Sequence, residues 1–375
     1  MTILVLGKEE NFAREAAGYM RAFSRKGDRV VGVNASFPPN GDIRLLLDRC
    51  GEQPTLILHP EQIPIMPRGL TKMRIPTACF HIDTYAYTGR RIAWSMLFDL
   101  ALVFHPGYET EFRAAGHSGV HFIPHAIESS LFLGEELSRV FDIGWVGQTG
   151  GPLYRTRERV LHGLSRSFRM NDWRARYEPE QTARVYRQSR VVVNIARDDF
   201  PQDANIRGFE AMAAGALLLT SLPTELEPIG FEEGVHFVGY RRETEIVPLV
   251  RKYLADEPAR RRITEAARHK VVREHSYDRR VETILELAKQ DGPKFLAPAR
   301  SWPEEKVRLA YLDYFAGNGV IDCALNELRA IAQLSLGEAA QGLGILARAW
   351  ARRSLTWMTG AIRYATKSIN NEAPR

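Results

Sequence analysis

The chain has 375 residues, more than one hydrophobic core usually accommodates, so we expect at least two domains. Apolar residues make up 45% of the sequence and charged residues 26%, a balance that is typical of globular proteins and excludes intrinsic disorder. The 51 lysines and arginines are interspersed with 45 acidic residues, for a net charge of only +6, which argues against a basic stripe that binds nucleic acid.

Short apolar runs alternate with helical patterns in the first third of the chain. The first run, residues 2–6, is followed by a loop that contains Gly7 and Lys8, and then by an amphipathic stretch at 12–25. The same reasoning predicts further strands at 29–33, 55–58, 78–82, 100–104 and 121–123. This alternation predicts a parallel sheet covered by helices on both faces, with the loops at the carboxyl ends of its strands available for ligands.

A second series of the same kind begins near residue 139. It opens with a predicted strand at 141–146, a glycine-rich loop at 147–152 and a helix at 155–168. Further strands are predicted at 191–195, 216–220 and 236–239, and further helices at 206–213, 243–254 and 258–290. Prolines interrupt the chain after residue 291, and 304–367 has an almost wholly helical pattern. We therefore predict an α/β protein of two doubly wound Rossmann-like domains that face a cleft, at 1–138 and 139–290, with a helical C-terminal extension at 291–375.

The cysteines and the N-terminus bear on the compartment. Cys50, Cys79 and Cys323 are odd in number and widely spaced, which argues against a disulfide framework and against a cysteine zinc site. The apolar run at the N-terminus is too short for a signal peptide, and no 18 apolar residues follow one another anywhere. We expect a cytoplasmic protein that does not span a membrane.

The segment 191–239 carries the most specific pattern in the sequence. It contains a strand, a variable loop, the pair Phe209 and Glu210, an Ala-Met-Ala-Ala-Gly helix end, an apolar strand and a Phe-x-x-Gly turn. This passage resembles the nucleotide-sugar-binding half of group 1 glycosyltransferases of the GT-B type, particularly the CgeB-like branch. Fainter similarity at 79–87 and 122–127 extends the resemblance over about residues 1–290.

The resemblance implies that Glu210 holds the ribose of a nucleoside-diphosphate sugar. The physical chemistry agrees, because one carboxylate can accept hydrogen bonds from two neighbouring hydroxyls. Glu210 is also predicted to lie early in a helix, whose amides and dipole suit phosphate. The structural alternative is a helix-start glutamate that only favours the dipole.

Basic residues near the same helix and near the glycine-rich loop are candidates for the donor diphosphate. Arg207 lies three residues before Glu210, and Arg155 and Arg157 follow the loop that begins at Gly147. The resemblance implies a cation on the diphosphate here, because the departing nucleoside diphosphate gains charge as the glycosidic bond breaks. Only one of Arg155 and Arg157 need act, and Arg207 could equally be a solvated helix-start arginine.

The sequence departs from the family pattern at the expected donor-sugar contact. Many group 1 enzymes carry a glutamate eight positions before the ribose-binding one, and here that position is Gln202, followed by Asp203. Either Gln202 hydrogen-bonds the sugar as a neutral group, or Asp203 replaces it through a shifted loop, or sugar transfer has been lost.

The first domain contributes the candidates for the reacting centre. His81 and Asp83 lie at the carboxyl end of a predicted strand, where His81 could act as a base or hydrogen-bond the donor sugar, and Asp83 could orient it or activate an acceptor hydroxyl. A buried histidine with a capping aspartate is the structural alternative. Gly7 and Lys8 could approach the acceptor or a phosphate group.

Together these residues predict a metal-independent glycosyltransferase with no cofactor, which moves a sugar from a nucleoside-diphosphate donor to an unidentified sugar, lipid or protein acceptor. One alternative is a non-catalytic nucleotide-sugar or glycan-binding protein of the spore or cell surface, which Gln202 favours. Another, weaker one is an NAD-dependent oxidoreductase, because the spacing of the glycines at 144–151 is wrong for dinucleotide binding.

The extension adds one further expectation. Residues 346–367 combine arginines and a lysine with tryptophans and aliphatic residues, a mixture that could rest at an anionic membrane surface, pack on its own domain or form a homodimer contact. Packing on its own domain or on a second subunit is the stronger expectation.

Overall fold

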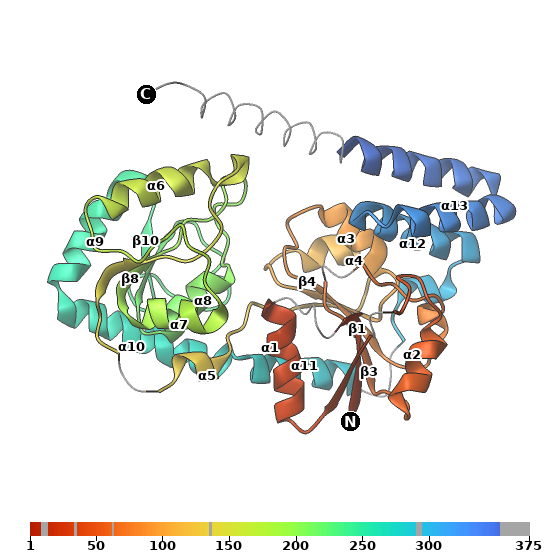
Figure 1. The fold of residues 1–375 in the computed structure, drawn as a ribbon, viewed down its shortest axis with the longest axis horizontal. Helices are drawn as coiled ribbons and strands as arrows, with labels where there is room; N and C mark the ends of the chain where they lie inside the picture. Colours follow the sequence, from red (N-terminus) through yellow and green to blue (C-terminus); the bar gives the residue numbers. More distant parts are fainter. Residues whose placement is uncertain (9–13, 34–35, 62–63, 135–136, 290–294, 353–375) are drawn as a thin grey trace.

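A computed structural model of the chain describes residues 1–8, 14–33, 36–61, 64–134, 137–289 and 295–352. It shows two α/β lobes side by side (Figure 1), each built around a parallel sheet. We call them the N-lobe, with the six-stranded sheet, and the C-lobe, with the four-stranded sheet. The predicted fold class, two Rossmann-like units and a C-terminal helical region, is confirmed.

The N-lobe sheet has the order β2-β1-β3-β4-β5-β6, so its strand order reverses at β1. Its strands are β1 (Thr2–Lys8), β2 (Arg29–Val33), β3 (Leu56–His59), β4 (Thr77–His81), β5 (Leu100–Val103) and β6 (Val120–Phe122). The helices between them are α1 (Arg14–Arg25), α2 (Ile43–Cys50), α3 (Thr88–Ser95) and α4 (Glu109–Ala114). Buried apolar residues alternate between its faces, as expected for a sheet covered on both sides.

The C-lobe sheet runs β7-β8-β9-β10, with every neighbouring pair parallel. Its strands are β7 (Phe141–Gly144), β8 (Ser189–Val193), β9 (Leu217–Ser221) and β10 (Val238–Tyr240). The associated helices are α5 (Ser129–Phe132), α6 (Arg155–Ser165), α7 (Pro179–Arg187), α8 (Ile206–Ala213), α9 (Ile246–Ala255) and α10 (Glu257–Glu274). Val191 and Val193 pack into the core on one face, and Val192 packs into the core on the other.

The chain returns to the N-lobe after α10. Helix α11 (Tyr277–Lys289) packs beside α1, and its residues Tyr277, Val281 and Ile284 belong to the core on one face of the N-lobe sheet. The predicted single helix at 258–290 is therefore two helices, with a break at His275 and Ser276. The break is anchored because the Ile127 amide donates to the His275 carbonyl and the Tyr277 amide donates to the Ile127 carbonyl.

The C-terminal extension covers the opposite face of the N-lobe sheet. Helix α12 (Glu304–Asn318) buries Leu312 and Phe315 in that core, and α13 (Ile321–Leu334) buries Ile331 there. A further helical stretch follows at 336–352. The expected packing on the chain's own domain is observed for this part of the extension. The helical pattern predicted for 304–367 is interrupted at Gly319, which ends α12 with a positive φ of 80°. Residues 353–367 of the predicted membrane or dimer helix lie outside the described residues.

A buried ion pair ties the extension to the sheet. Asp99, which is 1% exposed, accepts from the Arg300 guanidinium at 2.9 Å and from the Ala297 amide at 3.0 Å. Cys50, Cys79 and Cys323 are buried and unpaired. Among the described residues, no helix combines the length and the apolar character needed to cross a bilayer.

A glycine in α1 makes the docking of α11 testable. A Cβ atom on Gly18 would lie 2.2 Å from the Tyr277 ring. We expect Gly18→Ala to lower the free energy of unfolding by about 1 to 3 kcal/mol, because this overpacking outweighs the better helix propensity of alanine. Urea unfolding measures the effect, and Gly89→Ala in α3, where nothing lies within 4 Å, is the matched control. Equal stability of the two variants would contradict the tight α1–α11 contact.

Candidate active site between the lobes

A pocket of about 270 Å³ lies where the carboxyl ends of the C-lobe strands face the N-lobe. The N-lobe contributes Asp83 and Tyr85, from the loop after β4. The C-lobe lines the remainder with Val146, Gly147, Gln148, Tyr154, Arg157, Arg197, Asp203, Asn205, Ile206, Arg207 and Glu210. We call this the interlobe pocket.

Helix α8 begins at the pocket. Asn205 caps the helix, with its side chain accepting from the Arg207 amide at 3.2 Å, so the first turn of α8 faces the cavity. The amides and the dipole of such a helix start favour an anionic group. Glu210 lies one turn further along, 4% exposed and lining the same cavity. The structure thus brings the helix start and the predicted ribose carboxylate to one site.

Arg207 is held in place by the pocket wall. Its Nε donates to the Val146 carbonyl at 2.8 Å, its Nη1 donates to Asn194 Oδ1 at 2.7 Å, and its guanidinium lies 5.0 Å from the centre of the Trp145 ring. A Cβ on Gly147 would lie 2.3 Å from Arg207 Nη2, so the loop after β7 needs glycine at this position.

Arg157 is the second anchored cation. It donates to the Ile195 carbonyl at 2.8 Å and to the Gln148 carbonyl at 2.7 Å. Burial, and then the nearby charge of Arg207, lowers the pKa of Arg157 to about 9, so it is still protonated at neutral pH. Arg155, by contrast, is exposed at the start of α6 and does not line the pocket. Of the two alternatives for this position, the structure brings Arg157 to the site.

Of Gln202 and Asp203, only one lines the interlobe pocket. Asp203 lines the pocket, and burial raises the pKa of its carboxyl group. Gln202 lies outside the lining, and its backbone carbonyl accepts from the Glu225 amide at 2.9 Å. The loop before α8 is therefore turned so that the residue after the expected position faces the cavity.

His81 lies away from the pocket. It is 0% exposed at the end of β4, with its ring centre 4.5 Å from that of Trp94 and its Nε2 3.6 Å from Cys79 Sγ. Burial holds its pKa well below the usual range. His81 points to the same sheet face as Cys79, two residues earlier, and that face is covered by the extension. This placement argues against the predicted catalytic role of His81, whereas Asp83 lies in the lining.

Gly7 and Lys8 are the remaining predicted site residues. Both belong to β1 rather than to a loop, and Gly7 is buried. Neither lines the interlobe pocket, and the side chain of Lys8 lies outside what the structure describes. Gly7 and Lys8 therefore end a strand, where the sequence analysis predicted a loop.

Several residues that the sequence analysis did not select join the lobes. The rings of Tyr85 and Phe200 stack at 4.0 Å across the interface, and Arg197 lies over Tyr85 at 5.3 Å. His105 Nδ1 contacts Glu225 Oε2 at 2.7 Å, also from lobe to lobe. In the sequence, these residues are marked only by their positions after predicted strands. Many other residues have such positions, so this signal could not identify the contacts between the lobes.

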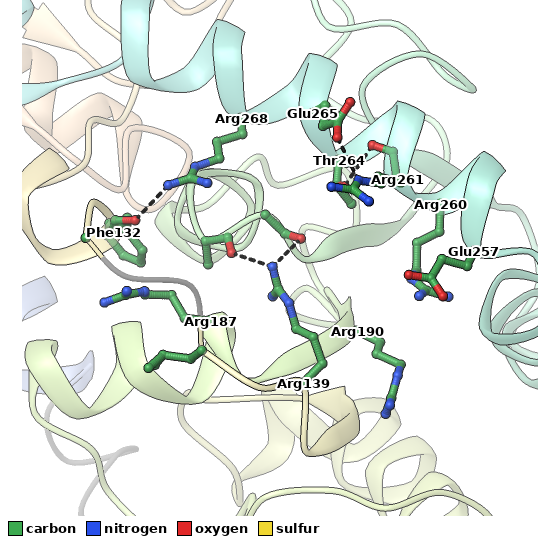
Figure 2. A pocket seen from close by; sticks show the side chains of 14 residues that line it. Phe132, Arg139, Arg187, Arg190, Glu257, Arg260, Arg261, Thr264, Glu265 and Arg268 are labelled. Carbon is green, nitrogen blue, oxygen red and sulfur yellow. Dashed lines mark hydrogen bonds and ion pairs between the residues drawn. The ribbon is translucent and has the colours of Figure 1, made fainter.

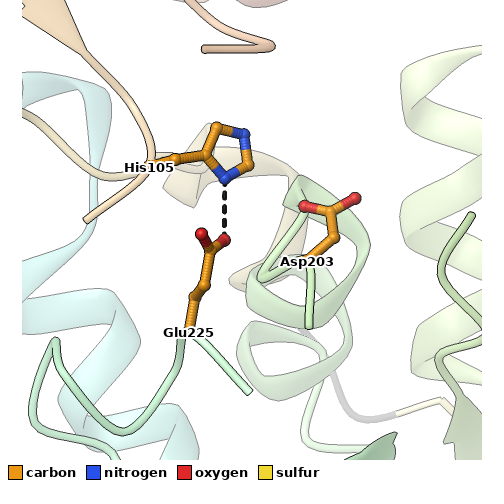
Figure 3. Close-up of side chains that lie close together, drawn as sticks. All are labelled: His105, Asp203 and Glu225. Atoms are coloured by element: carbon orange, nitrogen blue, oxygen red, sulfur yellow. Dashed lines mark hydrogen bonds and ion pairs between the residues drawn. The ribbon is translucent and has the colours of Figure 1, made fainter. Parts of the chain in front are cut away.

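His105, Glu225 and Asp203 form a buried cluster at this junction (Figure 3), with one ligand atom of each within 4.8 Å of the others. In the described part of the chain, this is the group that could hold a metal ion. An imidazole and two carboxylates would suit a divalent transition metal. The hydrogen bond between His105 and Glu225 also gives the cluster a purely structural use.

Comparison with known proteins agrees with this arrangement. Residues 147–286 match a family model described as glycosyl transferase-like. HepE from Anabaena, solved in complex with UDP, is similar in structure, with a TM-score of 0.55, 12% identity, and coverage of 76% of this chain and 100% of that one. The chain has the GT-B fold.

Two further structures share this fold. Sucrose-phosphate synthase from Thermosynechococcus elongatus has a TM-score of 0.54 and 14% identity, over 77% of this chain and 98% of that one. A glycosyltransferase from Rickettsia africae has a TM-score of 0.54 and 9% identity over the same shares of the two chains. No curated protein sequence matches this GT-B chain.

Proposed function

We propose that this GT-B protein is a glycosyltransferase that moves a sugar from a nucleoside-diphosphate donor to an acceptor in the interlobe pocket. The observation that carries the proposal is the convergence of Glu210, Arg207 and Arg157 on the start of α8, inside the segment that matches the glycosyl transferase-like family. Membership of the CgeB-like branch and a cytoplasmic location stay predictions.

In the proposed mechanism, the C-lobe holds the donor. Glu210 accepts hydrogen bonds from the ribose hydroxyls, and the α8 amides with Arg207 and Arg157 bind the diphosphate. These cations are fixed to backbone and amide oxygens before the donor arrives. They therefore stabilise the charge that develops on the departing nucleoside diphosphate without reorganising.

The N-lobe faces the donor from across the pocket. Asp83 is the carboxylate that this lobe contributes to the lining, so we assign it to the acceptor side, where it would receive the proton of the attacking hydroxyl. The Tyr85–Phe200 stack and the His105–Glu225 pair hold the lobes together at this point. Excluding water there favours transfer to the acceptor over hydrolysis.

A panel of nucleotide sugars tests the proposal. The purified protein should be stabilised in thermal unfolding by one donor class, and it should release the matching nucleoside diphosphate when acceptors are supplied. Binding without any release would favour the non-catalytic sugar-binding protein. If no nucleotide binds, the assignment of the interlobe pocket is wrong.

We also expect turnover to be independent of metal. The arginines and the α8 amides meet the diphosphate charge, so activity should persist in excess chelator. The assay must follow turnover, because magnesium also binds free nucleotide. Activity that is lost in chelator and restored by manganese would contradict this prediction and assign the metal to His105, Asp203 and Glu225.

A pair of substitutions identifies the donor-sugar ligand. Because Asp203 lines the pocket and Gln202 does not, we expect Gln202→Leu to keep most of the activity and Asp203→Ala to lose roughly tenfold or more. Asp203 also accepts from Asn205 Nδ2 at 3.2 Å, so Asp203→Asn is the variant that best preserves the local fold. Turnover with a saturating acceptor is the measurement. The opposite order of effects would return the role to Gln202.

A further inference from the structure

A second polar cavity lies at the amino ends of the C-lobe strands, opposite the interlobe pocket. Its volume is about 290 Å³, and it is lined where strands begin rather than where they end. Arg139 precedes β7, Arg190 is near the start of β8, and Gly215 precedes β9. The interlobe pocket lies after the same strands, so this cavity is a separate site. We call it the basal pocket.

Arginine dominates the lining of the basal pocket (Figure 2). Six arginines face it, together with only two acidic residues, Glu257 and Glu265. The arginines are Arg139, Arg187, Arg190, Arg260, Arg261 and Arg268. They come from the segment before β7, the end of α7, β8 and one face of α10, so the tertiary fold gathers them.

Part of this charge has a structural use. Arg139 donates to the carbonyls of Tyr186, Ser189, Ala214 and Gly215 at 2.8–3.2 Å, which ties together the ends of α7 and α8. These hydrogen bonds fix the position of the Arg139 guanidinium group in the pocket wall. Its charge is nevertheless present there, because carbonyl groups do not neutralise it.

Two of the other arginines form ion pairs that are open to solvent. Arg261 pairs with Glu265 at 2.9 Å and Arg190 with Asp142 at 3.3 Å, and both pairs are partly or largely exposed. Exposed ion pairs contribute little, so an incoming anion can compete for these arginines. Burial lowers the pKa of Arg260, and the charge of Arg190 acts in the same direction, whereas the nearby carboxylates of Glu257 and Asp256 raise it.

Two guanidinium groups lie near the end of α5 and near Gly134. Arg268 donates to the Phe132 carbonyl at 3.3 Å, and Arg187 Nη2 would lie 3.6 Å from a Cβ on Gly134. In the view of Figure 2, Arg187 and Arg268 lie at one end of the pocket and Arg190 and Arg260 at the other. The cations are spread over the cavity, which suits a ligand with charge at more than one point.

We propose that the basal pocket binds a compact anion that carries two or more phosphate groups. Guanidinium groups bind phosphate through paired hydrogen bonds, and several are available from different directions. The volume lies at the lower end of the range for small-molecule pockets, which favours a compact ligand over a folded macromolecule. The phosphates can belong to a free small molecule or to a phospholipid headgroup, which present the same chemistry.

Inorganic tripolyphosphate is the first probe, and isothermal titration of the full chain is the measurement. The test variant is Arg187→Gln with Arg268→Gln. The control is Arg184→Gln with Arg262→Gln, which removes two exposed arginines from the same helices, α7 and α10, outside the pocket. We expect the test variant to bind at least tenfold more weakly than the control variant, and the difference to shrink as salt is raised.

A second variant keeps the test decisive if the first does not fold. Arg190→Gln with Arg187→Gln leaves the α10 arginines in place and should show the same loss. Tripolyphosphate can also enter the interlobe pocket, but binding there is equal in the test and control variants. Equal affinity in both would therefore overturn the proposal without touching the proposed glycosyltransferase activity.

Vesicles distinguish the two sources of phosphate. Cosedimentation with phosphatidylcholine vesicles that contain phosphatidylinositol bisphosphate, but not with phosphatidylcholine alone, would assign the pocket to a lipid headgroup if the test variant loses it. Tripolyphosphate binding without such cosedimentation would assign it to a free phosphorylated molecule. Failure of both probes, or binding to RNA alone, would overturn the proposal.

Discussion

Replacing Glu210 with glutamine should weaken nucleoside-diphosphate binding roughly tenfold to a hundredfold while the protein stays folded. The loss of charged hydrogen bonds to the ribose costs about 1.5 to 3 kcal/mol, which corresponds to that range of affinity. Glutamine keeps the shape of this nearly buried side chain, so the α8 packing should survive. Calorimetric titration of the variant with the donor nucleotide, after its circular dichroism has been checked, measures the effect.

Two controls make the Glu210 result specific. Glu180→Gln removes an exposed carboxylate from the first turn of α7, away from the interlobe pocket. It therefore measures the effect of losing a helix-start carboxylate that does not line this pocket. A dideoxynucleotide lacks the ribose hydroxyls, so Glu210→Gln should hardly change its affinity. Unchanged affinity for the normal nucleotide in a folded Glu210→Gln protein would reject the ribose assignment.

Gly147→Ala should remove the diphosphate contact without removing the ribose contact. The new Cβ would lie 2.3 Å from Arg207 Nη2 and 3.1 Å from the Trp145 ring. Trp145 is fully buried and cannot move easily, so the guanidinium must leave its position. We expect nucleoside-diphosphate affinity to fall by roughly tenfold or more, the effect of losing hydrogen bonds to a charged group.

The decisive comparison for Gly147→Ala is between nucleoside diphosphate and nucleoside, measured by competition. Affinity for the nucleoside should change little, because it has no phosphate for Arg207 to bind. Gly163→Ala in α6 is the control, since no atom lies within 4 Å of a Cβ placed there, and it should raise stability by about 0.5 to 1 kcal/mol. An equal loss for nucleoside and nucleoside diphosphate would mean that the substitution disrupts the whole pocket.

Local pattern was sufficient to predict the parallel sheets and the helix that carries Glu210. Strands such as β8 and β9 are continuous apolar runs because both of their faces are buried, and this is legible in the sequence. Gly215 follows α8 with a φ of 68°, and this end of the helix was predicted to the residue at Ala213. The proposed donor side was therefore accessible from short-range information.

Other features depended on contacts between distant segments. The orientation of the first turn of α6 decides that Arg157 rather than Arg155 lines the pocket. The conformation of the loop before α8 decides that Asp203 rather than Gln202 lines it. The docking of α11 on the N-lobe depends on the close approach of Tyr277 to Gly18 of α1, two residues that lie far apart in the sequence. The six arginines of the basal pocket lie far apart in sequence, so no local pattern groups them.

By itself, the sequence determined the succession of strands along the chain, the parallel sheets and the position of the α8 start, because periodicity and turn residues act over a few neighbours. The tertiary structure decided which strand-end residues face a cavity. His81 and Asp83 both end the same strand region, but His81 packs against Trp94 and Phe112 on the sheet face that the extension covers, and Asp83 is left at the pocket. That choice depends on long-range packing, which a residue's own neighbours in the chain do not encode.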